Sequence, residues 1–271
     1  MNTDVKQENQ ALVKTILVSQ PQPNDTKSPY NVLAEKYGIR IDFKQFIRIE
    51  GLAAKDFRKY KVNPVEFTAV IFTSKNAVTH FFRLCDEMRI KMSPEVKYFC
   101  STEAIANYLQ KYIFFRKRKV FFAKTERKNA LQELLKKHRK GEKFILPCTV
   151  NRIDDLPDYL KNNNFQFAEA PVYETVFADF SDMEGKLDYD MLVFFTPMGI
   201  QSLFHNFPDF QQNATRIAVL GTAVQQAAEQ FQLRLDVQAP TPEHPSITAA
   251  IEHYLQSIGQ KPVAGNTSVI E

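Results

Sequence analysis

Residues 70–78 read Val-Ile-Phe-Thr-Ser-Lys-Asn-Ala-Val, and residues 192–200 read Leu-Val-Phe-Phe-Thr-Pro-Met-Gly-Ile. Each stretch is a short apolar run that ends in a hydroxyl residue and continues into a helical pattern. Such an arrangement predicts a strand, a tight turn and a capped helix. Because the pattern occurs twice, two related α/β domains explain it most economically. Chance similarity between two strand–helix units is the alternative.

The sequence that follows each copy extends the repeat. Phe99-Cys-Ser-Thr102 comes after the first copy, and Val219-Leu-Gly-Thr222 comes after the second. Both segments end an apolar run with small residues and open a helical pattern. Each half of the chain therefore predicts strand, hydroxyl turn, helix, strand, small-residue turn and helix in the same order.

Short apolar runs alternate with amphipathic segments along the remaining chain as well. Short strands separated by helices of this kind are typical of βα units and a parallel sheet. We expect strands at residues 15–19, 69–73, 97–100, 119–122, 144–146, 191–195, 217–220 and 235–237. We expect helices to begin near residues 28, 75, 102, 126, 151, 198, 222 and 246.

The composition is that of an ordinary globular chain of 271 residues, with 44% hydrophobic and 24% charged residues. No apolar run approaches the roughly 20 residues that cross a bilayer. The first residues are polar and lack the apolar region of a secretory signal. Residues 1–12 and 259–271 are expected to be flexible tails. Cys85, Cys100 and Cys148 lie far apart in the sequence, which favours buried free thiols in a reducing cytoplasm.

Positive charge is concentrated in one segment. Residues 111–143 contain thirteen Lys and Arg against three Glu, a balance of +10 in a chain whose overall balance is +4. A basic stretch can bind nucleic acid or another polyanion. The alternative is a solvated surface, and no zinc-finger, helix-turn-helix or RNA-recognition signature supports the nucleic-acid interpretation.

The four turns after the repeated strands are candidate ligand sites. In an open parallel sheet, ligands collect at the carboxyl ends of the strands. Each turn there begins a helix, whose first N–H groups and dipole favour an anion. Hydroxyl groups are contributed by Ser74, Thr102, Thr196 and Thr222. The alternative is that these hydroxyls only cap their own helices. Four such ends facing one cleft would suit a ligand with many carboxylates or phosphates.

Several catalytic signatures are missing from the sequence. It contains no GxGxxG, no GxxxxGK[ST] and no GxSxG motif. The five histidines, at positions 80, 138, 205, 244 and 253, do not have metal-ligand spacing. The sequence therefore favours a protein without a nucleotide cofactor, a metal or an activated serine.

With these turns placed, the chain resembles the uroporphyrinogen-III synthase family over residues 14–258. The resemblance depends on the order and spacing of several segments rather than on one motif. These segments are KTILVSQPQP with YNVLAEKYGI, VIFTSKNAVTHFF, FILPCTVNRIDDLPDYLKNNNF with APVYETV, LVFFTPMGIQSLF, IAVLGTAVQQAAEQF and APTPEHPSITAAIEHYL.

The resemblance implies an α/β fold of two similar flavodoxin-like parallel-sheet domains joined by a two-stranded linker. The first domain would contain residues 13–46 and 175–258, and the second would contain residues 47–174. The chain would cross between them near residues 46–49 and 172–175, which are short apolar segments.

The resemblance also implies an activity. The family cyclises the linear tetrapyrrole hydroxymethylbilane to uroporphyrinogen III, with inversion of the last pyrrole ring through a spiro intermediate. It uses no cofactor and no metal. The substrate is a polycarboxylate, which agrees with anion-binding turns. The enzyme would act mainly by positioning the substrate.

The resemblance also implies a role for individual residues of this chain that match the family's site positions. Tyr173 matches a family tyrosine that is a candidate proton donor to the departing hydroxyl, and its alternative role is packing in the linker. Arg152 would hold a carboxylate, or would be a surface arginine at a helix start. The remaining substrate-binding positions would be Thr73, Ser74, Lys75, Ser101, Thr102, Thr196, Gly221 and Thr222.

Three positions depart from the family pattern. Gln20 stands where the family usually has arginine, and Ala104 and Val224 stand where threonine is common. These departures leave open a non-catalytic protein of the same fold that binds a polyanion or a protein partner. The absence of heptads favours a monomer, and we expect a cytoplasmic protein with no membrane and no nucleic-acid partner.

Overall fold

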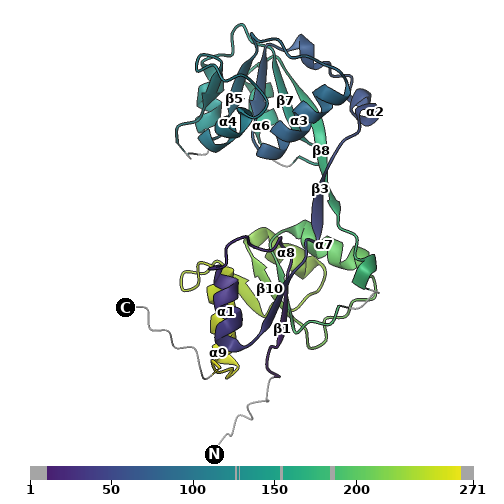
Figure 1. Cartoon of the computed structure of the whole chain (residues 1–271), viewed down its shortest axis with the longest axis vertical. Helices are drawn as coiled ribbons and strands as arrows, with labels where there is room; N and C mark the ends of the chain where they lie inside the picture. The colour runs from purple at the N-terminus through teal and green to yellow at the C-terminus, as the bar shows by residue number, and fades with distance from the viewer. Residues whose placement is uncertain (1–10, 126, 128, 153–154, 184–186, 264–271) are drawn as a thin grey trace, which may run out of the picture. The chain divides into compact units, whose positions relative to one another are not determined.

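The structure is a computed structural model that describes residues 11–125, 127, 129–152, 155–183 and 187–263. The chain forms two compact units. Unit 1 combines the residues up to Arg48 with those from Phe177 onward, and unit 2 contains Ile49–Val176 (Figure 1). The expected tails at residues 1–12 and 259–271 lie largely outside the described residues.

Unit 1 is built on a parallel sheet in the order β11-β10-β9-β1-β2. When the five strands of the unit are renumbered 1 to 5 in chain order, the sheet read from β2 to β11 has the order 2-1-3-4-5. This is the strand order of flavodoxin-like folds. The direction of the strand order changes between β1 and β9, which are neighbours. The strands are β1 (Thr15–Val18), β2 (Arg40–Phe43), β9 (Met191–Phe194), β10 (Arg216–Leu220) and β11 (Val237–Ala239).

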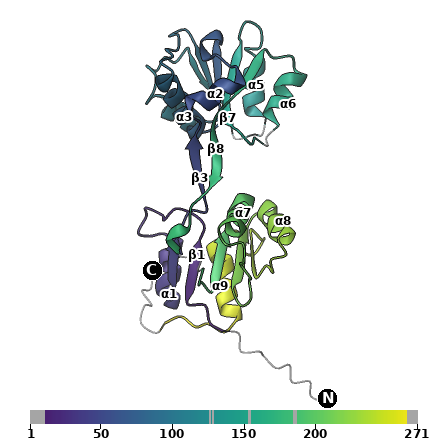
Figure 2. The same ribbon diagram turned by 90° about the vertical axis from the view of Figure 1, so that its right-hand side faces the viewer.

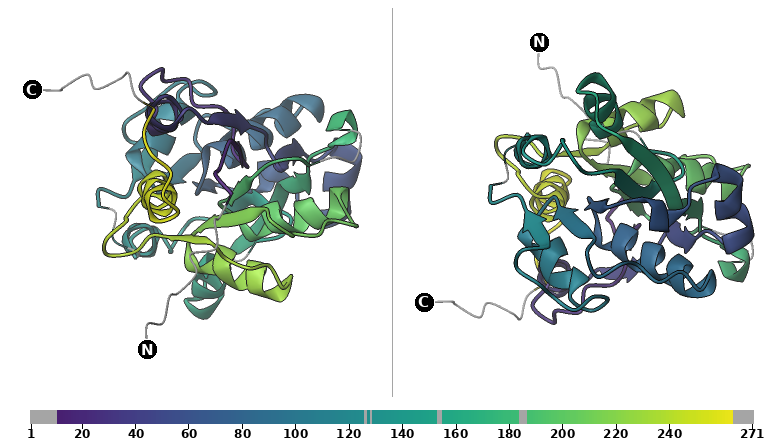
Figure 3. Two further views of the ribbon diagram at one scale, coloured as in Figure 1. Left: turned by 90° about the horizontal axis from the view of Figure 1, so that it is seen from below. Right: turned by 90° about the horizontal axis from the view of Figure 1, so that it is seen from above.

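Helices cover both faces of this sheet, because successive strand residues point to opposite sides. Ile16 and Val18 pack with α1 (Pro29–Tyr37) and α9 (Ile247–Ser257). Leu17 packs on the other side with α7 (Pro197–Asn206) and α8 (Thr222–Gln230). Figure 2 shows α7 beside α8, and α9 and α8 can be followed from below in the left panel of Figure 3.

Unit 2 has a six-stranded sheet in the order β3-β8-β7-β4-β5-β6. The pairs from β8 to β6 are parallel. The strands are β3 (Ile47–Gly51), β4 (Ala69–Phe72), β5 (Lys97–Cys100), β6 (Val120–Phe122), β7 (Phe144–Thr149) and β8 (Phe167–Phe177). Strands β3 and β8 are the two segments in which the chain passes between the units.

The faces of the unit 2 sheet are also divided between two helix pairs (Figure 2). Val70 and Phe72 pack with α3 (Lys75–Glu87) and α4 (Glu103–Leu109). Ala69 and Ile71 pack on the opposite face with α5 (Ala130–Lys136) and α6 (Leu156–Asn162). A short helix, α2 (Ala54–Phe57), follows β3 and places Phe57 in the first of these cores.

The two sheets have the same spatial order of strands. Reading β6-β5-β4-β7-β8 in unit 2 corresponds to β11-β10-β9-β1-β2 in unit 1. The repeated stretches become β4 and β9, each at the centre of its sheet. The chain enters the two units at different strands, so that unit 1 is a circular permutation of unit 2. The duplicated α/β pattern and the predicted parallel sheets are therefore confirmed.

Two helices begin later than the sequence suggests. The helix expected near residue 126 begins at Ala130, and the helix expected near Asn151 begins at Leu156. Pro157 explains the second difference, since proline is tolerated in the first turn of a helix and breaks its interior. The later start leaves residues 150–152, which follow β7, outside helix and strand.

Candidate functional site

Ser74 and Thr102 begin two helices of unit 2 at the carboxyl edge of its sheet. The Ser74 Oγ accepts a hydrogen bond of 3.0 Å from the Ala77 N–H, which caps α3. The Thr102 Oγ1 accepts one of 3.3 Å from the Ile105 N–H, which caps α4. Both hydroxyls therefore stabilise their helices, as the capping alternative predicts. Capping leaves the earliest N–H groups of each helix available to an anion.

The corresponding turns of unit 1 behave differently from each other. The Thr196 Oγ1 accepts a hydrogen bond of 3.1 Å from the Gly199 N–H and caps α7. Gly221 precedes α8 with a φ of 98°, a conformation that favours glycine. Thr222 is the first residue of α8, and no side chain caps this helix. Three of the four predicted hydroxyls are thus caps, and Thr222 is not.

Small-ligand sites are typically cavities of about 300–1,000 Å³. Unit 2 has one of ≈ 530 Å³ at this edge. It lies where the direction of the strand order changes, since β4 and β7 are neighbours. The turns after β4, β5, β6 and β7 all contribute to it. Its lining includes the predicted residues Thr73, Ser101, Thr102 and Arg152.

Thr125 and Arg127 are further lining residues that sequence reasoning missed. They follow β6, in the basic stretch that the sequence presents as a surface. The signal that identifies them is positional, because a turn after a parallel strand belongs to the same edge as the other turns. With Arg127 and Arg152, this cavity has two guanidinium groups suited to carboxylates.

Arg152 is half-buried near the end of β7. Burial raises the pKa of the nearby Cys148 thiol to about 11, and the positive charge of Arg152 acts in the opposite direction. At neutral pH the thiol stays protonated. The structure thus places Arg152 in the wall of the cavity beside a neutral group.

Tyr173 lies in β8, next to the irregularity in its pairing with β7. Its hydroxyl is 3.4 Å from the Ser74 Oγ, and its ring is packed against the core that contains α3. The ring centre is 5.6 Å from that of His80. Tyr173 is not among the residues that line the cavity of ≈ 530 Å³. The structure therefore brings Tyr173 together with Ser74, at the first turn of α3.

His80 is a titratable side chain whose ring lies near that of Tyr173. Burial, and then the positive charge of Arg83, lowers the pKa of His80 below its usual value. Its Nδ1 is buried without a hydrogen-bond partner in the described part of the chain. The imidazole is therefore neutral at neutral pH. No pattern in the sequence associates His80 with Tyr173.

Lys75 is not among the residues that line the cavity. Its Nζ is 5.7 Å from the centre of the Tyr108 ring at the end of α4. The Tyr108 hydroxyl is 2.9 Å from the Thr79 Oγ1. Lys75 and Tyr108 thus form a cation–π contact along the α3–α4 surface.

The three departures from the family pattern have different surroundings. Val224 is 3% exposed and packs in the unit 1 core, so a valine suits its position. Ala104 is exposed in the first turn of α4. Gln20 is half-exposed after β1 and brings no cation to that turn.

No group of three or more His, Cys, Asp and Glu that could hold a metal ion occurs among the described residues. Across the same part of the chain, none of the helices has the length and apolar character that a bilayer-spanning helix needs.

These features define a two-domain α/β protein with anion-suited turns at the carboxyl edges of both sheets. The family described as uroporphyrinogen-III synthase HemD matches residues 28–249. The chain belongs to the uroporphyrinogen-III synthase family. It is accordingly a cyclising lyase of haem and tetrapyrrole biosynthesis that acts on a tetrapyrrole.

Solved structures agree with this fold. The uroporphyrinogen-III synthetase of Helicobacter pylori is 19% identical with a TM-score of 0.57, covering 90% of this chain and 99% of that one. A mutant uroporphyrinogen III synthase of Thermus thermophilus is 13% identical with a TM-score of 0.51, again covering 90% and 99%. No curated protein sequence matches the chain.

Proposed function

We propose that the chain cyclises hydroxymethylbilane to uroporphyrinogen III, with Tyr173 as the proton donor to the departing hydroxyl. The observation that carries this assignment is the hydroxyl pair of Ser74 and Tyr173 at the carboxyl edge of unit 2, 3.4 Å apart. A phenol is protonated at neutral pH, since its ordinary pKa is about 10. It can therefore supply a proton without help from a metal or a second acid.

The hydrogen bonds of Ser74 determine which hydroxyl donates in the Ser74–Tyr173 pair. The Ser74 Oγ already accepts the Ala77 N–H. Its own hydrogen can then point to the Tyr173 oxygen, which leaves the phenolic hydrogen free for the substrate. The neutral His80 beside the ring adds no positive charge that would promote loss of the phenolic proton.

The proposed reaction returns Tyr173 to its protonated state at the end of each turnover. The substrate C–O bond breaks, and the oxygen leaves with the phenolic proton as water. The carbon so activated bonds to the last pyrrole ring to give the spiro intermediate. Rearrangement and closure release a proton from a pyrrole carbon, which restores the phenol. General acid assistance of this kind contributes about 10²–10⁴-fold in rate.

We propose that the turn residues bind the substrate carboxylates. In unit 2 these are Thr73, Ser74, Ser101, Thr102 and Arg152, and the cavity that four of them line supports this role. Lys75 is included as a cation at the start of α3, held near Tyr108. In unit 1 we propose Thr196, Gly221 and Thr222, which begin α7 and α8.

We also propose that each compact unit is one domain, and that the protein is a cytoplasmic monomer without a nucleic-acid partner. The buried free cysteines support a reducing compartment. Acidic side chains of the same chain pair with cations of the basic stretch. Lys119 is 2.7 Å from Glu95, and Lys143 is 3.4 Å from Glu66. This pairing supports a solvated surface rather than a nucleic-acid interface.

The test is the product isomer formed by Tyr173→Phe. We expect about 10²-fold slower formation of uroporphyrinogen III, because the hydroxyl is lost and the ring is kept. Chromatography of the oxidised products separates isomer III from isomer I, the spontaneous product. Tyr60→Phe is the control, since Tyr60 is an exposed tyrosine of the same unit.

An unchanged rate in Tyr173→Phe would assign the residue to packing. If the unsubstituted protein yields only isomer I and is still stabilised by the substrate in a thermal-shift assay, the chain is a non-catalytic binder.

A further inference from the structure

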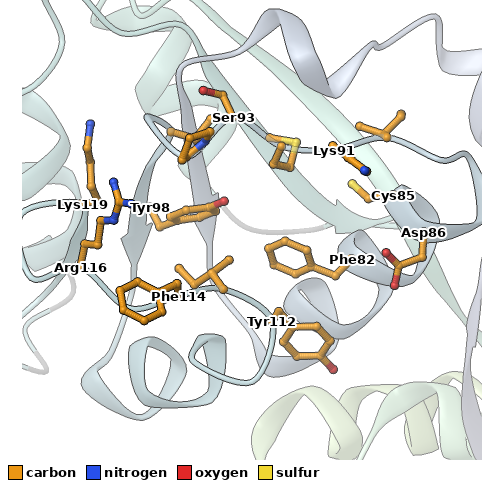
Figure 4. A pocket seen from close by; sticks show the side chains of 15 residues that line it. Phe82, Cys85, Asp86, Lys91, Ser93, Tyr98, Tyr112, Phe114, Arg116 and Lys119 are labelled. Carbon is orange, nitrogen blue, oxygen red and sulfur yellow. The ribbon is translucent and has the colours of Figure 1, made fainter.

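Unit 2 has a second pocket, at the opposite edge of its sheet from the hydroxyl turns. It is formed by the end of α3, the loop from α3 to β5 and the loop from α4 to β6, which both lead to the amino ends of strands. Its volume is ≈ 360 Å³. Figure 4 shows its lining side chains. This pocket shares no lining residue with the cavity that contains Arg152.

The inner wall of the pocket is aromatic. Phe82 and Tyr112 are stacked, with ring centres 5.1 Å apart and planes inclined by 13°. The centre of the Tyr98 ring lies 6.4 Å from that of the Phe82 ring. Aliphatic side chains of Ile90 and Val96 complete the apolar surface. A flat aromatic ring suits such a wall, since offset and edge contacts between rings are favourable.

Tyr98 adds one polar group to this wall. Tyr98 is 5% exposed, and in the described part of the chain its hydroxyl makes no hydrogen bond. Burial raises the pKa of Tyr98 to about 12, so the phenol is neutral and can donate. In Figure 4 its hydroxyl points toward the middle of the group of lining side chains. The hydroxyl lies in the lining of the pocket, where it is available to donate a hydrogen bond to a ligand or to water.

Cations surround the mouth. Lys91, Arg116 and Lys119 line it, against the single carboxylate of Asp86. Lys119 is held 2.7 Å from Glu95, whereas Arg116 is 3.9 Å from the same carboxylate. Lys91 forms no ion pair among the described residues. Lys91 and Arg116 are therefore the charges best able to meet an anion.

Phe114 is the most exposed large hydrophobic residue at this mouth, with 87% of its surface open to solvent. Figure 4 shows its ring on the Arg116 side of the pocket. A ligand that covers this ring would remove apolar surface from water, which is favourable.

We propose that this pocket binds a small organic anion with an aromatic ring, its ring against Phe82, Tyr98 and Tyr112, and with Lys91 and Arg116 as the cations at the mouth that attract its acid group (Figure 4). The site is separate from the proposed catalytic residues, and it does not depend on the proposed function. Aromatic walls with a few convergent polar groups are typical of small-molecule sites.

The probe is 8-anilino-1-naphthalenesulfonate, an aromatic anion, compared with N-phenyl-1-naphthylamine, which has the same rings without the sulfonate. Fluorescence titration of the full chain should give one saturable site for the anion, with a Kd several-fold lower than that of the neutral dye. The anion should also raise the Tm, because it binds the folded state.

Variants then locate the site. Lys91→Met and Arg116→Gln should each weaken the anion about threefold or more and leave the neutral dye unchanged. Phe114→Ala should weaken both dyes. Lys161→Met is the matched control on α6, and Arg127→Gln is the control for the other cavity. Neither should change binding of the anion, and rates of isomer III formation should be unchanged in Lys91→Met and Arg116→Gln.

Three outcomes would overturn the proposal. The first is equal affinity for both dyes. The second is loss of anion binding in Arg127→Gln or Lys161→Met rather than in the variants at Lys91 and Arg116. The third is a Tm lowered by the anion, which would indicate binding to a loosened state.

Discussion

At the scale of single residues, the central feature is that Ser74 has two roles. It caps α3 through the Ala77 N–H, and it lies 3.4 Å from the Tyr173 hydroxyl. The sequence predicts the first role, because a hydroxyl residue between a strand and a helix is a typical N-cap. The second role depends on β8, which is 99 residues away in the chain.

We predict that Ser74→Ala lowers kcat about fivefold, because one hydrogen bond that orients the donor is worth about 1 kcal/mol. Steady-state kinetics of isomer III formation checks this. Ser74→Thr retains a hydroxyl and should recover most of the rate. Ser246→Ala removes a comparable cap from α9 in unit 1 and should lower stability alone. Equal rates in Ser74→Ala and Ser246→Ala would contradict the positioning role.

The site residues differ in how far sequence could predict them. Thr73, Ser101 and Thr102 follow strands of the repeat, so their place at one edge follows from periodicity. Thr125 and Arg127 also line the cavity but lie in a basic stretch without an apolar repeat. Their position depends on where β6 enters the sheet. Lys75 lies within the repeated motif and was predicted as a site residue. The motif did not indicate that its amine lies near the Tyr108 ring.

At the scale of elements, the strand β3 is anchored to α3 by a close set of contacts. An Arg83 guanidinium N–H donates to the Leu52 carbonyl, and another donates to Glu87 at 2.7 Å. Glu87 also accepts the Ala54 N–H at 3.0 Å. Gly51 lies under these groups, where an added Cβ would be 2.5 Å from His80 Nδ1 and 2.7 Å from Arg83 Nε. Glycine at this position lets the strand approach the helix.

We predict that Gly51→Ala destabilises unit 2 by about 1–3 kcal/mol, because the methyl group displaces the His80 and Arg83 side chains. Urea unfolding measures the change. In a background that carries both His80→Ala and Arg83→Ala the same substitution should cost clearly less, since both obstructing side chains are gone. Equal costs in both backgrounds would show that the strain lies elsewhere.

The elements themselves were largely predictable, and the exceptions have physical reasons. The central strands β4 and β9 are apolar on both faces and easily recognised. Strand β2 has the sequence Arg-Ile-Asp-Phe and lies at a sheet edge, so its polar residues conceal it. Strand β8 has eleven residues, yet only its central apolar part stands out in the sequence.

At the scale of the whole molecule, the hydrophobic cores are divided between the units. Two clusters belong to unit 2 and two to unit 1, and among the described residues each buried cluster lies within a single unit. Separate cores are expected to melt as separate cooperative steps. The match of residues 28–249 to one family does not contradict this, because cooperativity depends on shared packing.

We predict two calorimetric transitions that respond to different substitutions. Phe99→Ala in unit 2 should cost about 3–5 kcal/mol, and Ile217→Ala in unit 1 about 2–5 kcal/mol, because both side chains are fully buried. Each should lower the Tm of one transition only. A single transition that moves with both substitutions would show that the cores unfold together.

The circular permutation has a consequence for how the chain can be divided. Unit 2 is a continuous insertion between β2 and β9, and the Ala178 N–H donates to the Phe46 carbonyl at 3.0 Å where the insertion begins and ends. The two cut ends of unit 1 are therefore already neighbours. Replacing residues 47–177 with a short Asn-Gly turn would join them without stretching the backbone. The product would be a miniature protein that carries only the unit 1 residues Thr196, Gly221 and Thr222, suitable for measuring how one set of turns holds a carboxylate.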